Sequence, residues 1–356
     1  MLKKFKQATL ASMKASGVFG LADRSRWRRA RLLILGYHGV SLEDEHEWDP
    51  SLFMSPEVFA ARLRLIKSAG CAVLPLGEAV ARLYAGELPD KAVAITFDDG
   101  TQDFRERAYP LLAEAGLDAT LYLTTFYSDF KRPVFNIVCS YLLWKGRGAR
   151  LDLAPFVGRA ASAKLSGGAS LDLSDASTRV RAARELREFA ERERLSAEEK
   201  DALAARLART LKVDYEKLRA RRLLHILAPE DVKSLSEGGV RIELHTHRHR
   251  APLERALFLR EIEDNRRRIS ALTGRTPVHF CYPSGVYDAR HLPWLEEAGV
   301  QTATTCEVGL ASRASNPLLL PRLLDTSSLS PVEFEGWLTG VAAAMPRRRA
   351  AGYVAG

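Results

Sequence analysis

Short apolar runs that alternate with longer amphipathic stretches are the feature that most limits how this chain can fold. The run at residues 31–40 (RLLILGYHGV) is typical of a buried strand, and residues 55–70 follow with a helical pattern. Ser55 is suited to be the N-cap of that helix and Pro56 its first residue. Because strands and helices keep alternating, the sequence predicts a largely parallel sheet covered by helices, either open or closed into a barrel. Chemistry is then expected at the carboxyl ends of the strands.

A different pattern interrupts this alternation in the middle of the chain. Its second half predicts two charged amphipathic helices, the second of which begins at a capping box of Ser196 and Glu199. We therefore predict four parts: a basic N-terminal helix or arm at 1–31, an α/β unit at 32–127 and 236–330, a helical insertion at 128–235, and a C-terminal helix and tail at 331–356.

Positive charge is concentrated at the N-terminus. The whole chain has a formal net charge of +9, and residues 1–31 contain four Lys and five Arg against one Asp. Leu2, Phe5, Leu10 and Met13 fall roughly on one side of a helix in this segment. Such a basic end is either a solvated tail or a surface that contacts an anionic membrane, and no nucleic-acid partner is expected.

Other whole-chain features bear on location. The N-terminal segment has no continuous apolar signal-peptide core, and no run approaches the roughly 18 apolar residues of a membrane span. We expect a cytoplasmic protein, with peripheral contact at the inner face of the membrane as an alternative. The four cysteines, at 71, 139, 281 and 306, are widely spaced, which indicates reduced thiols.

Two polar motifs follow predicted strands. The first is TFDDG at 96–100, where Asp98 and Asp99 are adjacent and therefore need two different partners. The second is HTHRH at 245–249. Two of its histidines, together with a carboxylate from another strand end, would make a metal site with an open position, and the second Asp would stay free as a general base.

These two motifs, in this order, resemble the polysaccharide deacetylase family, the NodB-homology carbohydrate esterases. The resemblance implies a distorted (β/α) barrel with a helical insertion. It also implies that Asp98 is the catalytic base and that Asp99, His245 and His249 hold a divalent metal. Zinc is the first choice, with nickel, cobalt, iron or manganese as alternatives.

Two departures from the family pattern concern the catalytic groups. The usual R-x-P-Y motif is replaced by FCYPSG, which resembles the Y-P-x-G form of a subgroup that resembles the exopolysaccharide deacetylases. A backbone N–H near Tyr282 would then hold the oxyanion, and Arg322 would pair with Asp98. The usual late histidine is absent, and His38, in a Y-H-x-V segment like that of the subgroup, would be the general acid.

The family likeness also places substrate-contacting positions at Thr246, Pro283 and Gly285. It implies a hydrolase of carbon–nitrogen bonds that removes N-acetyl groups from an amino-sugar polysaccharide or oligosaccharide. Two alternatives stay open: a deformylase or deacylase of a lipid-linked amino sugar, which the basic N-terminus favours, and a catalytically inactive carbohydrate-binding barrel, which the missing arginine and late histidine favour.

Overall fold

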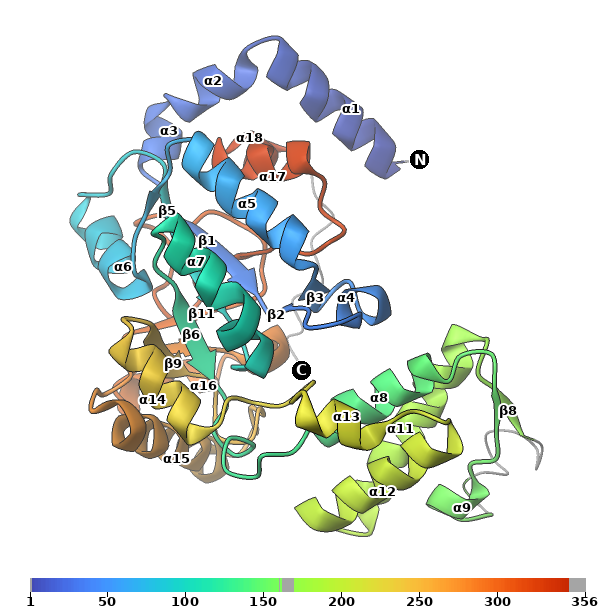
Figure 1. Ribbon diagram of the computed structural model, residues 1–356. Helices are drawn as coiled ribbons and strands as arrows, with labels where there is room; N and C mark the ends of the chain where they lie inside the picture. The colour runs from blue at the N-terminus through green and yellow to red at the C-terminus, as the bar shows by residue number, and fades with distance from the viewer. Residues whose placement is uncertain (1, 160, 162–169, 346–356) are drawn as a thin grey trace. The chain divides into compact units, whose positions relative to one another are not determined.

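The computed structural model describes residues 2–159, 161 and 170–345, and the chain divides into two compact units (Figure 1). The first unit contains the segments up to Phe126 and from Leu227 onward. The second unit contains Tyr127–Ile226. The helical insertion expected at 128–235 overlaps this second unit, and α14 (Pro229–Glu237) lies in the first unit.

Most strands of the first unit belong to a single parallel sheet. Its strands, in chain order, are β1 (Leu33–Tyr37), β4 (Ala72–Val73), β5 (Ala92–Phe97), β6 (Thr120–Leu123), β9 (Arg241–Leu244), β10 (His279–Cys281), β11 (Thr302–Thr304) and β12 (Leu323–Leu324). In space the order is β11-β10-β9-β6-β5-β1-β12, with β4 beside β5. A separate parallel pair is formed by β2 (Gly39–Val40) and β3 (Phe53–Met54).

The helices of the first unit connect these strands or cover them. In chain order they are α1 (Leu2–Ala15), α2 (Val18–Asp23), α3 (Arg26–Arg29), α4 (Glu45–Trp48), α5 (Pro56–Ser68), α6 (Leu76–Ala85), the π-helix η1 (Phe104–Ala108), α7 (Tyr109–Ala115), α14, α15 (Arg255–Thr273), the 3₁₀ turn η2 (Pro283–Gly285), α16 (His291–Glu297), α17 (Pro331–Leu338) and α18 (Val341–Ala344).

The segment 317–324 closes the sheet into a distorted barrel. At one side it bonds to β11, where Leu320 N–H donates to Ala303 O and Thr305 N–H donates to Leu320 O. At the other side β12 pairs with β1, with Leu35 opposite Leu323. The predicted α/β barrel is therefore confirmed, and the carboxyl ends of its parallel strands meet at one end.

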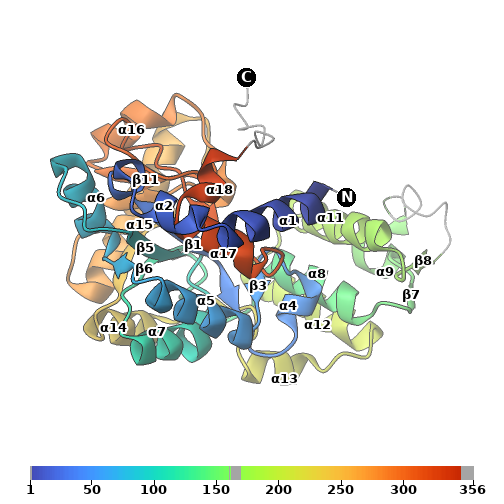
Figure 2. The same cartoon turned by 90° about the horizontal axis from the view of Figure 1, so that it is seen from above.

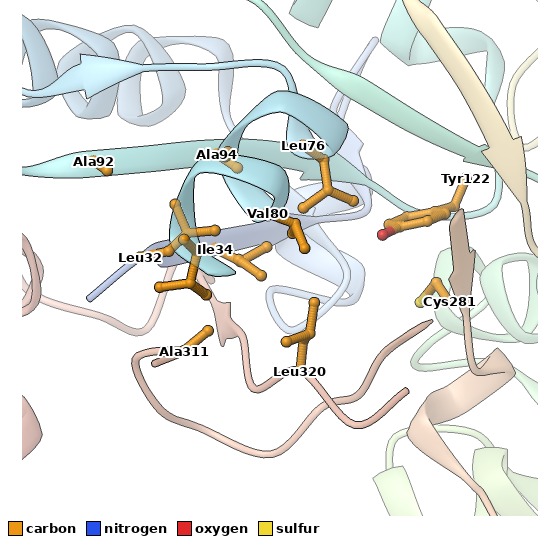
Figure 3. Close-up of a cluster of buried hydrophobic side chains, with 12 residues drawn as sticks. Leu32, Ile34, Leu76, Val80, Ala92, Ala94, Tyr122, Cys281, Ala311 and Leu320 are labelled. Carbon is orange, nitrogen blue, oxygen red and sulfur yellow. The ribbon is translucent and has the colours of Figure 1, made fainter. Parts of the chain in front are cut away.

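The barrel interior is built from alternate strand residues. Leu32 and Ile34 from the β1 segment face Ala92 and Ala94 of β5 in a fully buried cluster, which α6 closes with Leu76, Ala79, Val80 and Leu83 (Figure 3). Successive residues of a strand face opposite sides. The same face of β5 therefore continues through Thr96 to Asp98, so an apolar interior leads directly to the carboxyl-end groups.

Local sequence signals placed several elements correctly. Ser55 caps α5 by accepting the Val58 N–H, and Pro56 is the first helical residue, as predicted. The N-terminal segment, by contrast, is not one helix but three, because the chain turns at Gly17, whose φ is 83°. Leu10 is buried whereas Phe5 is 73% exposed, so the predicted single apolar side is wrong for Phe5.

The second unit is a small helical body. Its elements are α8 (Phe135–Lys145), β7 (Arg150–Leu151), α9 (Ala154–Val157), β8 (Leu171–Asp172), α11 (Ala176–Arg192), α12 (Ala197–Thr210) and α13 (Tyr215–Ala220) (Figures 1 and 2). The predicted capping box at Ser196 and Glu199 opens α12, and α11 is the other charged amphipathic helix. α8 is largely buried, since it provides the apolar layer against which these two helices pack.

Two whole-chain predictions can be compared with the described residues. All four cysteines are free thiols, as expected. Within residues 2–159, 161 and 170–345, no helix combines the length and the apolar character needed to cross a bilayer. Part of the predicted C-terminal tail, residues 346–356, lies outside the described residues.

Candidate active site

Asp98 and Asp99 directly follow β5, and their side chains have different partners. Asp98 is 2% exposed and its N–H donates to Tyr37 O, which continues the pairing with β1. Asp99 has a φ of 69° and Gly100 a φ of 80°, so the chain turns sharply here. A Cβ on residue 100 would lie 2.4 Å from Leu123 Cδ1, which makes glycine necessary at this turn. The two neighbouring carboxylates can therefore have separate partners.

Arg322 is the partner of Asp98. It precedes β12, is fully buried, and donates from Nη1 and Nη2 to the two carboxylate oxygens of Asp98, each at 2.8 Å. Its remaining hydrogens go to Thr96 Oγ1, Thr305 O and Cys281 Sγ. Burial alone would raise the pKa of Asp98, but the charge and hydrogen bonds of Arg322 outweigh it and hold the pKa at about 2. Asp98 is therefore a fixed anion.

Asp99 lies with two histidines from the loop after β9. Its Oδ1 is 3.1 Å from Nε2 of His245 and 3.1 Å from Nε2 of His249. Burial opposes ionisation of Asp99, yet the two imidazoles lower its pKa well below the usual value. His245 Nδ1 donates to Cys281 O at 2.8 Å, so Nδ1 keeps its proton and Nε2 is the nitrogen that remains to ligate a metal.

Helix α15 holds this histidine loop from behind. Asn265 is fully buried, accepts the His245 N–H at 3.0 Å, and donates to Leu123 O and Thr125 Oγ1 at the end of β6. One turn earlier, Glu261 accepts from Arg248 N and Arg250 Nε. These contacts fix the loop at two points.

His38 follows β1 beside Asp98. Its Nε2 is 3.9 Å from Asp98 Oδ2, and 22% of its side chain is exposed, so it lies at the open side of the pair. The next segment is held by Asp103, whose Oδ2 accepts the Val40 N–H at 2.7 Å. Burial raises the pKa of Asp103 to about 7.

Comparison with known proteins agrees with this arrangement. The sequence profile of the polysaccharide deacetylase family matches residues 85–134 and 200–303, which include both polar motifs. YxkH of Bacillus subtilis (strain 168), a protein assigned to the polysaccharide deacetylases, is 34% identical over 106 residues. That match covers 28% of this chain and 36% of the relative's length.

The matched residues, less than half of the chain, are similar to the polysaccharide deacetylase family. Solved structures share its fold. Streptococcus pyogenes deacetylase PplD, in complex with acetate, has a TM-score of 0.55 at 18% identity and covers 89% of this chain and 99% of its own. IcaB from Ammonifex degensii has a TM-score of 0.52 at 15% identity and covers 88% of this chain and 97% of its own. At these identities the likeness concerns the fold alone.

Deacetylases of this family generally depend on a metal, and one cluster of this chain fits such an ion. The ligand atoms of Asp99, His245 and His249 all lie within 4.8 Å of one another, and one carboxylate oxygen with two imidazole nitrogens suits a borderline divalent metal. A second group of similar size, Asp98, His245 and Cys281, fits poorly, because the Arg322 cation already contacts Asp98 and the Cys281 sulfur.

The structure does not bring every predicted site residue to the surface of the site. The Tyr282 N–H donates to Thr304 O at 3.2 Å, so the oxyanion donor predicted near Tyr282 would have to be a neighbouring amide. Thr246 is fully buried and accepts the Arg250 N–H, which places it inside the turn and not where a substrate could touch it. Pro283 is buried, while Gly285 is half-buried.

His247, between the two clustered histidines, is directed elsewhere. Its Nδ1 lies 2.9 Å from Thr125 Oγ1, and its ring packs edge-on against Phe126. It is not among the three residues of the Asp99 cluster.

Sequence reasoning missed the supporting residues Asn265 and Glu261. A signal was present: both lie on the face of α15 that also carries the buried Phe258, Ile262 and Ile269, and two polar residues on a buried helix face need partners. Cys281 was missed as well, and nothing in its local sequence distinguishes it from a core thiol.

Proposed function

We propose that this protein is a metal-dependent hydrolase that removes N-acetyl groups from an amino-sugar polysaccharide or oligosaccharide. The observation that supports this most is the adjacent pair Asp98 and Asp99, one held by a buried arginine and the other by two histidines. A base and a metal-ligating carboxylate are the two groups that amide hydrolysis at such a site needs.

Asp99, His245 and His249 would hold the divalent ion, with zinc as the first choice. When bound, the ion supplies positive charge that polarises the acetamide carbonyl. Three protein ligands leave a coordination position open, which is the usual plan of a catalytic site. Asn265 and the Cys281 carbonyl would keep His245 in the ligating orientation.

Asp98 would accept the proton of the attacking water. The bidentate pair with Arg322 keeps its carboxylate ionised and fixes its plane, so the remaining lone pairs point in a defined direction. Because a base of this kind contributes a factor of about 10² to 10⁴ to the rate, its loss should be severe.

His38 would donate the proton to the departing amine. Its partly exposed ring lies 3.9 Å from Asp98 Oδ2, so the nitrogen that leaves when an amide C–N bond breaks between the two groups could take its proton from His38. The oxyanion donor would be the Ser284 N–H, because Pro283 has no N–H and Ser284 has the next amide along the chain. The φ of Ser284 is 56°, which shows a tight turn at this position. Gly285 beside it would then face the substrate.

A second candidate is a deformylase or deacylase of a lipid-linked amino sugar. The observation that favours it is the exposed basic and apolar N-terminal surface, described below. A catalytically inactive carbohydrate-binding barrel is less well supported, because the buried Arg322 pairs with Asp98 and His38 is near the same carboxylate. The cytoplasmic location stays a prediction, which fractionation of the source cells would test.

Product analysis separates these candidates. Purified protein is stripped of metal, reloaded with zinc or cobalt, and incubated with N-acetylglucosamine oligosaccharides and with an N-formylated amino-sugar lipid. Acetate released only after reloading supports the first candidate. Formate without acetate supports the second, and stoichiometric metal binding without either product supports the inactive barrel.

A further inference from the structure

Two of the three exposed large apolar side chains in the N-terminal helices are more exposed than any other among the described residues. Phe5 is 73% exposed and Leu21 is 74% exposed, and Trp27 is 41% exposed. These three side chains and the cations around them are called here the N-terminal surface. Exposed aromatic and aliphatic side chains gathered in one short segment indicate an interaction site.

Phe5 and Leu21 point away from the body of the first unit. Leu10 of α1 and Phe19 of α2 are buried in a cluster with Val341 of α18, and α1 also packs against α17. Each helical residue turns by about 100°, so Phe5 lies about 140° from Leu10 and Leu21 about 160° from Phe19. Figures 1 and 2 draw α1 and α2 along the outside of this unit. Both apolar side chains therefore face outward.

Five of the nine cations in residues 1–31 divide into a paired and an unpaired group. Lys6 and Lys14 pair with Glu333 and Glu335 of α17, which attaches α1 to the unit. Lys4, Arg24 and Arg26 are exposed, and the described residues offer them no ion pair. The segment's single acidic residue, Asp23, is paired with Lys91. The outward side is thus positive without internal compensation.

We propose that the N-terminal surface docks on an anionic lipid bilayer. Lys4, Arg24 and Arg26 would lie at the headgroups, and Phe5 and Leu21 would enter the acyl boundary. Trp27, with the Arg31 guanidinium 4.2 Å from its ring centroid, is an aromatic of the kind found at the membrane interface. A nucleic acid or an acidic polysaccharide would engage the cations but would leave Phe5 and Leu21 exposed. This proposal goes beyond the proposed catalytic function and does not depend on it.

The test is co-sedimentation of the full chain with vesicles. Neutral phosphatidylcholine vesicles are compared with vesicles that contain about 30% anionic phosphatidylglycerol, at low and high salt. We expect binding to the anionic vesicles only, weaker at high salt. A Phe5→Ser/Leu21→Ser variant should bind about tenfold more weakly or worse, since it loses two apolar insertions. A Lys4→Glu/Arg24→Glu/Arg26→Glu variant should lose binding.

Matched controls keep the outcome specific. Leu253→Ser/Leu257→Ser removes two other exposed leucines of the first unit, which are 47% and 43% exposed. Arg64→Glu/Arg107→Glu/Arg313→Glu reverses three other exposed cations. Both controls should bind as the wild type does. The proposal is overturned if the wild type stays in the supernatant at low salt, if the controls lose as much binding, or if the Phe5/Leu21 variant binds normally. Binding to RNA or polyphosphate without binding to vesicles would also overturn it.

Discussion

The two ends of the barrel each bury a carboxyl group, but with different partners. At the carboxyl end, Asp98 pairs with the fully buried Arg322 cation. At the amino end, Glu243 accepts only from the Val278 and His279 N–H groups among the described residues. Burial raises the pKa of Glu243 to about 7, while the pKa of Asp98 is held at about 2. Both residues are buried, Asp98 at 2% and Glu243 at 9% exposure, so the more deeply buried carboxyl has the lower pKa. The charged partner, and not the depth, decides which of them keeps a low pKa.

The amino end also has a polar cavity but lacks the grouping of the active site. A pocket of about 280 Å³ is lined by Gly77, Glu78, Glu243 and His279, among others. Burial lowers the pKa of His279 to about 4, so this histidine is neutral. Within the described residues, the metal-capable groups of three lie at the carboxyl end and none at this pocket. The comparison therefore favours the carboxyl end as the place of the proposed chemistry.

The largest expected effect comes from removing a metal ligand at the carboxyl end. His245→Ala should lose both bound zinc and turnover, because it removes one of three ligand atoms from the cluster. Zinc content by atomic absorption and acetate release measure this. Since His245 is buried, unfolding is compared in EDTA, and a metal-free variant about as stable as the metal-free wild type excludes simple misfolding. Full zinc retention would break the assignment.

Removing the charged partner should make the carboxyl end resemble the amino end. Arg322→Met leaves Asp98 buried without its cation, so we expect the free energy of unfolding to fall by about 3–5 kcal/mol. Urea unfolding measures the loss, and the Asp98→Asn/Arg322→Met double variant should regain part of it. Arg290→Met, which breaks the surface pair with Asp288, is the matched control and should cost less than about 1 kcal/mol. Equal losses in the two single variants would contradict the comparison.

A smaller effect is expected from the helix behind the histidine loop. Asn265→Ala removes the acceptor of the His245 N–H, and the affinity for zinc should fall by about 10–100-fold. Competition with a chromophoric chelator measures this affinity. Glu263→Gln, an exposed position on the same helix, should leave it unchanged. Unaltered zinc affinity in Asn265→Ala would mean that the loop holds its shape without α15.

The smallest effect is expected at the amino end and depends on pH. Folded Glu243 keeps its proton up to about pH 7, whereas the unfolded chain loses it near the ordinary value of 4.5, so stability falls as pH rises through this window. His279 acts in the opposite direction, since its stabilising contribution is lost as pH falls from 6.5 toward about 4.

Glu243→Gln isolates the first of these contributions. Relative to the wild type, it should gain about 2 kcal/mol between pH 5 and pH 8, because the variant has no carboxyl to ionise. Urea unfolding at several pH values measures the difference. Glu78→Gln, at the mouth of the same pocket and paired with Arg82, is the control and should show no such divergence. Parallel pH profiles of wild type and Glu243→Gln would show that Glu243 ionises normally.

Local signals account for what the sequence could predict. The Ser55 cap, the capping box at Ser196 and Glu199, and the buried strand that ends at Phe97 each depend on neighbours within a few residues. Such local patterns can be recognised from residues that are close together in the sequence. The pairing of Asp99 with His245 joins residues 146 positions apart, and it was predicted through two motifs that resemble a known family.

Contacts between residues far apart in the sequence could not be predicted from local sequence patterns. The Tyr282 N–H donates to Thr304 O, and Thr304 becomes a neighbour only through the order of strands in the sheet. Phe5 was expected to share a side with Leu10, yet α1 offers its buried face to α17 and α18 and leaves Phe5 outside. Asn265 reaches the end of β6, which lies 142 positions away along the chain. In each case a distant element decides the role of the residue.

The central claim is that the two adjacent carboxylates have different roles, Asp98 as base and Asp99 as metal ligand. Asp98→Asn tests it most directly, with zinc content and acetate release measured on the same preparation. The account predicts full zinc occupancy with turnover reduced by about 10² to 10⁴-fold. Near wild-type turnover, or loss of zinc together with turnover, would contradict it.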